Sequence, residues 1–302
     1  MNRSERRLRL EAPGDFDFWT TVRSSGWCGL APFSFEEERR TLSRIHGLTN
    51  GKKVKMTIME KGTRLLDVEV ESGSELGRTD MEELEGVVRT CLRMDEDLSP
   101  FYEMIEDHPD LAWVKEMSAG RTVRSPTVFE DVVKTICSTN CSWALTKAMS
   151  HRLCRELGEP CSEELYTFPT PQRMALATEA FMRAEVKTGY RSPYLIGLAR
   201  QQAEGALDVE EWRNSPLDSA SLKREIMEIK GVGEYAADHI LRLLGRYDFL
   251  GLDSWLRRRF SQIHGGGEAA SDDDIEGFYA PFGRWKGLVL WLDMIKEYIR
   301  VL

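Results

Sequence analysis

The segment from 222 to 245 restricts the fold most, because it places a turn with two glycines between two amphipathic helical patterns. Leu222 and Ile226 lie one helical turn apart before the turn, and a second helical pattern follows it. Gly231 and Gly233 allow a tight reversal that side chains would block. The second helix would begin with free backbone N–H groups, which can bind a phosphate without reading a base sequence. We therefore predict two helices joined by a tight hairpin.

The same glycines also fit a dinucleotide-binding fingerprint, with Asp253 at a suitable distance along the chain. That fingerprint requires a buried strand before the glycines, and buried parallel strands are nearly continuous in apolar residues. The segment before Gly231 instead has the period of a helix and carries charges such as Lys223 and Glu228. Too little chain follows Asp253 for a doubly wound sheet. We therefore do not expect a nucleotide cofactor.

The rest of the sequence predicts an α+β protein. Val54, Met56 and Ile58 alternate with polar residues, which is typical of a strand in an antiparallel hairpin. Helical patterns follow, and capping-box spacing at Thr79/Glu82 and at Thr127/Glu130 predicts two helix starts. Further helices are expected around 142–156, 171–184, 193–203, 221–229, 234–244, 254–263 and 285–300.

We divide the chain into two domains on these patterns. Residues 1–80 are expected to form a small N-terminal antiparallel β domain. Residues 81–302 are expected to form an all-helical body of two subdomains. The body contains the hairpin at 222–245 and a loop with Asp253 at 246–255.

The hairpin and the aspartate about twenty residues after it resemble the signature of the helix-hairpin-helix (HhH-GPD) superfamily of DNA glycosylases. Five further segments are similar to 8-oxoguanine DNA glycosylases: 125–130, 136–140, 168–170, 189–191 and 281–285. The N-terminal β segment resembles the domain shared by the 8-oxoguanine and 3-methyladenine II branches. The resemblance covers residues 80–300 well and 1–80 loosely.

The resemblance implies a base-excision repair enzyme with Asp253 as the catalytic residue. Its substrate would be double-stranded DNA whose damaged base, an oxidised purine or an alkylated base, is flipped into a pocket. Breaking the base–sugar bond leaves positive charge on the sugar, which a carboxylate can stabilise while it orients water. The simpler interpretation is that Asp253 only caps a helix, and both roles can coexist.

Tyr235 departs from the pattern of the bifunctional 8-oxoguanine enzymes, which carry a lysine there that forms a Schiff base. A tyrosine cannot form an imine, so we expect a monofunctional enzyme that uses water. Lys230 replaces a proline of the family and is expected to face the DNA backbone. Two alternatives stay open: a bifunctional 8-oxoguanine glycosylase/AP lyase that uses another amine, and a non-catalytic DNA-damage-binding module.

The resemblance also supplies the other candidate site residues. The expected base pocket consists of Tyr235, His239, Cys137 and Trp143, although His239 could equally be an ordinary helix histidine. The expected DNA-binding residues are Asn140, Cys141, Tyr190, Arg191, Lys230, Gly231, Val232, Gly233 and Arg257. A structural Na⁺ or K⁺ ion could bind the backbone carbonyls of Met227, Ile229 and Val232.

Composition bounds the remaining expectations. The net charge of −9 argues mildly against nucleic acid, although basic residues gather at 256–259 and 284–286. The six cysteines form no zinc or iron–sulfur pattern, so no required cofactor is expected. We see neither a secretory signal nor a membrane-spanning segment. We expect a monomer that is not secreted, located in the cytoplasm with the nucleoid if bacterial and in the nucleus if eukaryotic.

Overall fold

The computed structural model describes residues 4–62 and 64–300. Its N-terminal part is an antiparallel sheet with strand order β1-β5-β4-β3-β2. The strands are β1 (Ser4–Glu11), β2 (Phe33–Glu36), β3 (Thr41–Gly47), β4 (Lys53–Glu60) and β5 (Leu65–Ser72). The predicted alternation is confirmed in β4, where Val54, Met56 and Ile58 are buried. The predicted α+β class is thereby confirmed.

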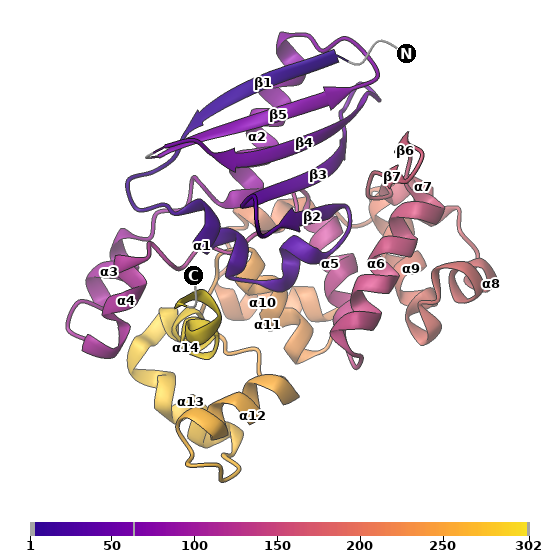
Figure 1. The fold of residues 1–302 in the computed structure, drawn as a ribbon. Coiled ribbons are helices and arrows are strands. Elements are labelled where there is room, and N and C mark those ends of the chain that lie inside the picture. The colour runs from indigo at the N-terminus through magenta and orange to yellow at the C-terminus, as the bar shows by residue number, and fades with distance from the viewer. Residues whose placement is uncertain (1–3, 63, 301–302) are drawn as a thin grey trace.

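Helix α2 (Arg78–Leu92) lies behind the sheet in Figure 1, and Leu84 and Val88 belong to the same apolar core as the strands. The prediction that this helix starts at Thr79 was wrong by two residues. The helix begins after Gly77, whose N–H donates to a carboxylate oxygen of Asp80 at 2.7 Å. Thr79 and Glu82 have the correct spacing, but the chain already turns into the helix two residues earlier.

The rest of the chain forms a helical body below the sheet (Figure 1). One core brings together α5, α6, α9, α10 and α11, and a second lies among α3, α4, α12, α13 and α14. The bounds are α3 (Ser99–Met104), α4 (Ala112–Glu116), α5 (Val128–Ser138), α6 (Trp143–Leu157), α7 (Pro171–Ala175), α8 (Glu179–Phe181), α9 (Ser192–Glu204), α10 (Ser219–Met227), α11 (Glu234–Leu243), α12 (Ser254–Ile263), α13 (Asp272–Tyr279) and α14 (Lys286–Arg300).

Most of the predicted helices are confirmed within a few residues, but the one expected at 171–184 is not continuous. α7 ends at Ala175, and Thr178 then begins α8 because its hydroxyl accepts a hydrogen bond from Phe181 N at 3.2 Å. A short π-helical turn, η3 (Met182–Val186), follows α8. A threonine in extended conformation at this point stops one helix and caps the next.

A buried ion network ties the sheet to the helical body. The Arg44 guanidinium on β3 donates to both carboxylate oxygens of Glu130 on α5, at 2.9 and 2.6 Å. The Lys134 ammonium donates to the same carboxylate at 2.6 Å. All three side chains are at most 3% exposed. Thr127 caps α5 as predicted, but the Glu130 side chain serves this network instead of completing a capping box.

The short segment between β1 and β2 runs down from the sheet toward the helical body (Figure 1). It contains α1 (Phe18–Arg23) and the 3₁₀ helix η1 (Gly26–Gly29). None of the helices in the described part of the chain is both long and apolar enough to cross a membrane.

Candidate active site

A cavity of about 430 Å³ lies where η1 meets α6, α11 and α12. Its lining includes Asp253, the expected catalytic residue, and three of the four expected pocket residues: Tyr235, His239 and Trp143. Its other lining residues are Ser25, Gly26, Trp27, Thr122, Ser138, Cys141, Thr146, Arg242, Leu243, Ser254, Trp255, Leu256 and Trp291. Elements far apart in the sequence thus meet around one aromatic hollow.

Asp253 is the N-cap of α12 and stands at the wall of this cavity. Its Oδ1 accepts a hydrogen bond from Leu256 N at 2.7 Å. Within residues 4–62 and 64–300, Oδ2 takes part in no hydrogen bond or ion pair. Capping therefore occupies one carboxylate oxygen and leaves the other without a partner among the described residues.

Tyr235 and His239 lie one turn apart on α11, with ring centroids 6.2 Å from each other. Burial and the nearby Asp253 carboxylate raise the pKa of the Tyr235 phenol, so this group is neutral at pH 7. Burial and the charge of Arg242 lower the pKa of His239 well below its ordinary value, so the imidazole is neutral as well. These two rings form an uncharged aromatic wall beside the aspartate.

Trp27 forms the wall facing His239, a position that no feature of the sequence predicts. The ring centroids of Trp27 and His239 are 4.8 Å apart, and those of Trp27 and Trp143 are 6.4 Å apart. Gly26 allows this approach, since a Cβ there would lie 2.5 Å from Cζ2 of Trp143. The segment after β1 thus completes a pocket that is otherwise built from the helical body.

Cys137 does not line the cavity, contrary to the prediction. It is fully buried in the core of the helical body, and burial raises the pKa of its thiol to about 12. The chain leaves α5 after Ser138 and turns at Asn140, which has a φ of +47°. Because of this turn Cys141, expected at the DNA surface, lines the cavity instead.

The hairpin between α10 and α11 depends on Gly231. Its φ is +93°, and a Cβ there would lie 2.6 Å from the Tyr194 ring. The prediction that a side chain would also block the turn at Gly233 was wrong. The φ of Gly233 is −99°, and no atom lies within 4 Å of a Cβ built on it. Val232 is buried beneath the turn, and the Lys230 residue is exposed. Of these two positions, only 231 therefore needs a glycine for the hairpin to fold as observed.

An exposed strip continues from the hairpin toward the Asn140 turn. Tyr194 lies against Gly231 and packs edge-on against Tyr190, at 6.3 Å between ring centroids. The Tyr190 hydroxyl lies 3.5 Å from the Asn140 amide nitrogen, and the Tyr190 ring is 48% exposed. The strip therefore connects two features that the sequence assigned to DNA binding.

Arg191 and Arg257 have partners within the protein. Arg191 is buried and donates to the backbone carbonyls of Ile136 and Thr139. Arg257 pairs with Asp272, with its Nε 2.6 Å from a carboxylate oxygen. Arg191 therefore holds the turn at the end of α5 in place and does not project from the surface.

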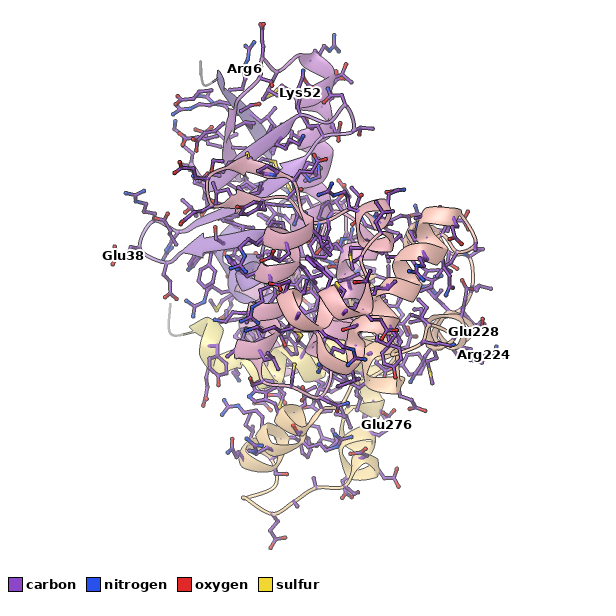
Figure 2. The ribbon with its side chains drawn as sticks, turned by 90° about the vertical axis from the view of Figure 1, so that its right-hand side faces the viewer. Arg6, Glu38, Lys52, Arg224, Glu228 and Glu276 are labelled. Carbon is purple, nitrogen blue, oxygen red and sulfur yellow. The ribbon has the colours of Figure 1, made fainter. Side chains whose placement is uncertain are left out.

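The surface around the hairpin carries both signs of charge. Figure 2 shows Arg224 and Glu228 projecting from its first helix at the edge of the molecule, with Glu276 lower on α13. Figure 2 also shows charged side chains over the rest of this side, including Arg6 and Lys52 of the sheet domain. Charges of both signs therefore lie next to the hairpin.

The backbone carbonyls of Met227, Ile229 and Val232, which were expected to hold a monovalent cation, lie in and beside the hairpin turn. Ile229 O accepts a hydrogen bond from Val232 N at 3.0 Å, which leaves its second lone pair. Met227 and Val232 supply two further carbonyls within the same turn. Such an ion would brace the turn and take no part in bond cleavage. Among residues 4–62 and 64–300, no group of three or more His, Cys, Asp or Glu side chains could hold a metal.

The fold and the site define a class of protein: a sheet domain on a two-part helical body, with a hairpin and a capping aspartate beside an aromatic cavity. Residues 133–279 match the family described as HhH-GPD superfamily base excision DNA repair protein. This match confirms, over these residues, the resemblance to the HhH-GPD superfamily that the sequence indicated.

Curated relatives fall into two groups by name. The chain is 25% identical over 164 residues to a DNA-3-methyladenine glycosylase from Bacillus subtilis (strain 168), covering 53% of this chain and 54% of that protein. It is 29% identical over 194 residues to a probable N-glycosylase/DNA lyase from Methanothermobacter thermautotrophicus, covering 56% and 61%. The matches thus span little more than half the length of these relatives.

Solved structures agree over almost the whole chain. A 3-methyladenine DNA glycosylase from Archaeoglobus fulgidus has a TM-score of 0.77 at 18% identity, covering 97% of this chain and 98% of that one. A structure of MBOgg1 in complex with a low-affinity DNA ligand has a TM-score of 0.73 at 20% identity, covering 100% and 99%. At these identities the likeness shows a shared fold.

Proposed function

We propose that this protein is a monofunctional DNA glycosylase that hydrolyses the N-glycosidic bond of a damaged base flipped out of double-stranded DNA. The observation that carries the proposal is the position of Asp253, which presents an uncommitted carboxylate oxygen to an aromatic cavity. The names of the relatives, which include glycosylases and a lyase, support this class of reaction.

The cavity suits a planar base. Trp27, Trp143, Tyr235 and His239 offer ring surfaces at its walls, on which a flipped base can stack. A base held there would have its sugar at the rim, beside the start of α12. As the bond to the base breaks, the Asp253 carboxylate would stabilise the positive charge on the sugar and orient water for attack.

Hydrolysis by water is favoured over lyase chemistry because the cavity offers no suitable amine. Among residues 4–62 and 64–300, no lysine lines the cavity. Tyr235 occupies the position at which the bifunctional enzymes carry their lysine, and a phenol forms no imine. Lys223, the nearest lysine on the hairpin's first helix, is paired with Asp238 at 2.6 Å.

The hairpin and the exposed strip would hold the duplex. Backbone N–H groups at the start of α11 can bind phosphates, with Lys230 and Gly233 beside them. Asn140 and Tyr190 are exposed on this strip, where Asn140 would fill the gap left by a flipped base and Tyr190 would press on the opposite strand. Binding of this kind is independent of sequence and should weaken as salt rises.

Single-turnover excision tests the proposal, on duplexes that carry oxidised, deaminated or alkylated bases, each read with and without hot alkali. We expect strand breaks only after alkali, and a loss of roughly 10²–10⁴ in rate for Asp253→Asn. Breaks without alkali would show a lyase. A near-normal rate for Asp253→Asn would remove the aspartate from catalysis, and absence of release from every duplex would favour a binding module.

Asp218→Asn provides the matched control. Asp218 caps α10 as Asp253 caps α12, with Ser221 N donating to its carboxylate at 2.7 Å, but it lies outside the cavity. An asparagine oxygen can accept the capping bond in both variants. Equal losses of activity in the two variants would mean that capping, and not chemistry, explains the effect at Asp253.

A further inference from the structure

Arg242 brings a positive charge to the cavity that the protein does not neutralise by contact. The side chain is 8% exposed, lies on α11 and lines the pocket. Within residues 4–62 and 64–300, it has no carboxylate oxygen within 4 Å. Its neighbours are Nδ1 of His239 at 2.7 Å and the face of Trp291 at 4.3 Å. A buried guanidinium stays protonated, so its N–H groups need acceptors.

The contact with Arg242 also fixes the tautomer of His239. A guanidinium can only donate, so Nδ1 of the imidazole must accept and the ring proton must lie on Nε2. Nε2 is buried and has no hydrogen-bond partner among the described residues. An unpaired buried donor is unfavourable unless something else accepts from it. The cavity wall therefore carries the Arg242 charge, with the buried N–H of His239, unpaired within the described part of the chain, beside it.

These groups discriminate between damaged bases by charge. A purine alkylated at N7 or N3 of its ring is a cation, which the guanidinium repels. An oxidised or deaminated purine is neutral and carries carbonyl oxygens that can accept hydrogen bonds. We infer that Arg242 and His239 make this pocket selective for neutral, acceptor-bearing damaged purines over cationic N-alkylated purines. This inference rests on the proposed glycosylase function.

Asp253 acts on Arg242 through its charge and makes no contact with it. Its carboxylate lies beyond ion-pair distance of Arg242, at the start of α12. It would act on the sugar of either class of substrate, since both classes develop the same positive charge there. Arg242 lies three residues from His239 and shares its side of α11, so it acts on the base.

The test compares single-turnover excision of hypoxanthine and 8-oxoguanine with that of 7-methylguanine, in duplexes of otherwise identical sequence, by the full chain and by Arg242→Gln. Glutamine keeps a donor and loses the charge. We expect the wild-type protein to release at least one neutral base faster than 7-methylguanine. We expect Arg242→Gln to lower the ratio of neutral to cationic excision roughly 10- to 100-fold, because a hydrogen bond from a charged group is exchanged for a neutral one.

Arg155→Gln is the control, since Arg155 lies on α6 outside the cavity and is half-exposed. The ratio of neutral-base to 7-methylguanine excision by this variant should match that of the wild type. Thermal melting and affinity for undamaged duplex show whether each variant is folded. Faster release of 7-methylguanine than of either neutral base would overturn the inference while Asp253-dependent excision still supported the proposed function. A ratio unchanged in folded Arg242→Gln would overturn it too, and no release of any base would overturn both.

Discussion

Nε1 of Trp27 donates a hydrogen bond to Oδ1 of Asp131 at 2.8 Å, across 104 residues of sequence. The acceptor lies on α5 and is buried, and Ser125 N donates to the same oxygen at 2.9 Å. The bond fixes the indole in the orientation that brings it 4.8 Å from the His239 ring. One polar contact therefore attaches the segment between β1 and β2 to the helical body and shapes the pocket.

Trp27→Phe should keep most of the ring and remove the donor, leaving the Asp131 carboxylate with one fewer hydrogen bond in a buried site. We expect the free energy of unfolding to fall by about 1–3 kcal/mol, as measured by urea denaturation. Trp113→Phe is the control, because Trp113 is also buried and its Nε1 has no partner among the described residues. Equal losses in the two variants would show that ring size, and not the hydrogen bond, is responsible.

The hairpin and Asp253 could be predicted because their signals are local. A helical period, a glycine at a positive φ and a capping aspartate are each set by residues within one or two turns. The N-terminal sheet was likewise indicated by the alternation at Val54, Met56 and Ile58 in β4. These features establish the fold class without knowledge of how the elements pack.

The walls of the cavity could not be predicted, because they depend on packing between distant elements. Trp27, Arg242 and Trp291 come from the segment after β1, from α11 and from α14, and no spacing relates them. Cys137 was misplaced for a related reason. The resemblance placed Cys137 in the pocket and Cys141 at the DNA surface, whereas α5 ends at Ser138 and the chain changes direction at Asn140.

The two hairpin glycines should respond differently to an added Cβ. Gly231→Ala places the new atom against the Tyr194 ring in a backbone conformation unfavourable for alanine, so we expect lower stability and weaker binding to every duplex. Gly233→Ala has space in the free protein and should leave the melting temperature unchanged. Fluorescence anisotropy with undamaged duplex and thermal melting give both quantities. Weaker binding by Gly233→Ala with normal stability would locate the DNA backbone against residue 233.

Glu130→Gln should destabilise the protein strongly, because Arg44 and Lys134 would lose their only shared carboxylate within the described structure. We expect a loss of about 3–5 kcal/mol, the range for breaking a buried ion pair. Glu82→Gln is the control, since its pair with Arg78 is exposed and should contribute about 0–1 kcal/mol. Similar losses in both variants would contradict a structural role for the buried network.

The same carboxylate predicts a pH dependence. Arg44 and Lys134 lower the pKa of Glu130 from 4.5 to about 2, despite the opposing effect of burial. A depressed carboxyl pKa stabilises the folded state above pH 4.5, and the contribution is lost as the pH falls toward about 2. The difference in unfolding free energy between the wild type and Glu130→Gln should therefore shrink over this interval. If this difference stayed constant down to the lowest pH at which the protein folds, the ionisation of Glu130 would not contribute to stability.

Arg191 separates a structural effect from a direct effect on DNA. Its guanidinium donates to the carbonyls of Ile136 and Thr139 just before the Asn140 turn. Arg191→Gln should lower the free energy of unfolding by about 1.5–3 kcal/mol, the range for a hydrogen bond to a charged group. It should also weaken duplex binding, because the turn that presents Asn140 loses its support.

Lys187→Gln removes an exposed charge from the same surface, four residues earlier, and should leave stability unchanged. Urea denaturation and the dependence of duplex affinity on salt distinguish the two variants. A direct phosphate contact by Arg191 would reduce the slope of log K against log salt by about 0.9, with stability unaffected. Loss of stability with an unchanged slope is the expected result for Arg191→Gln, since a buried guanidinium that donates to two carbonyls supports the Asn140 turn from within.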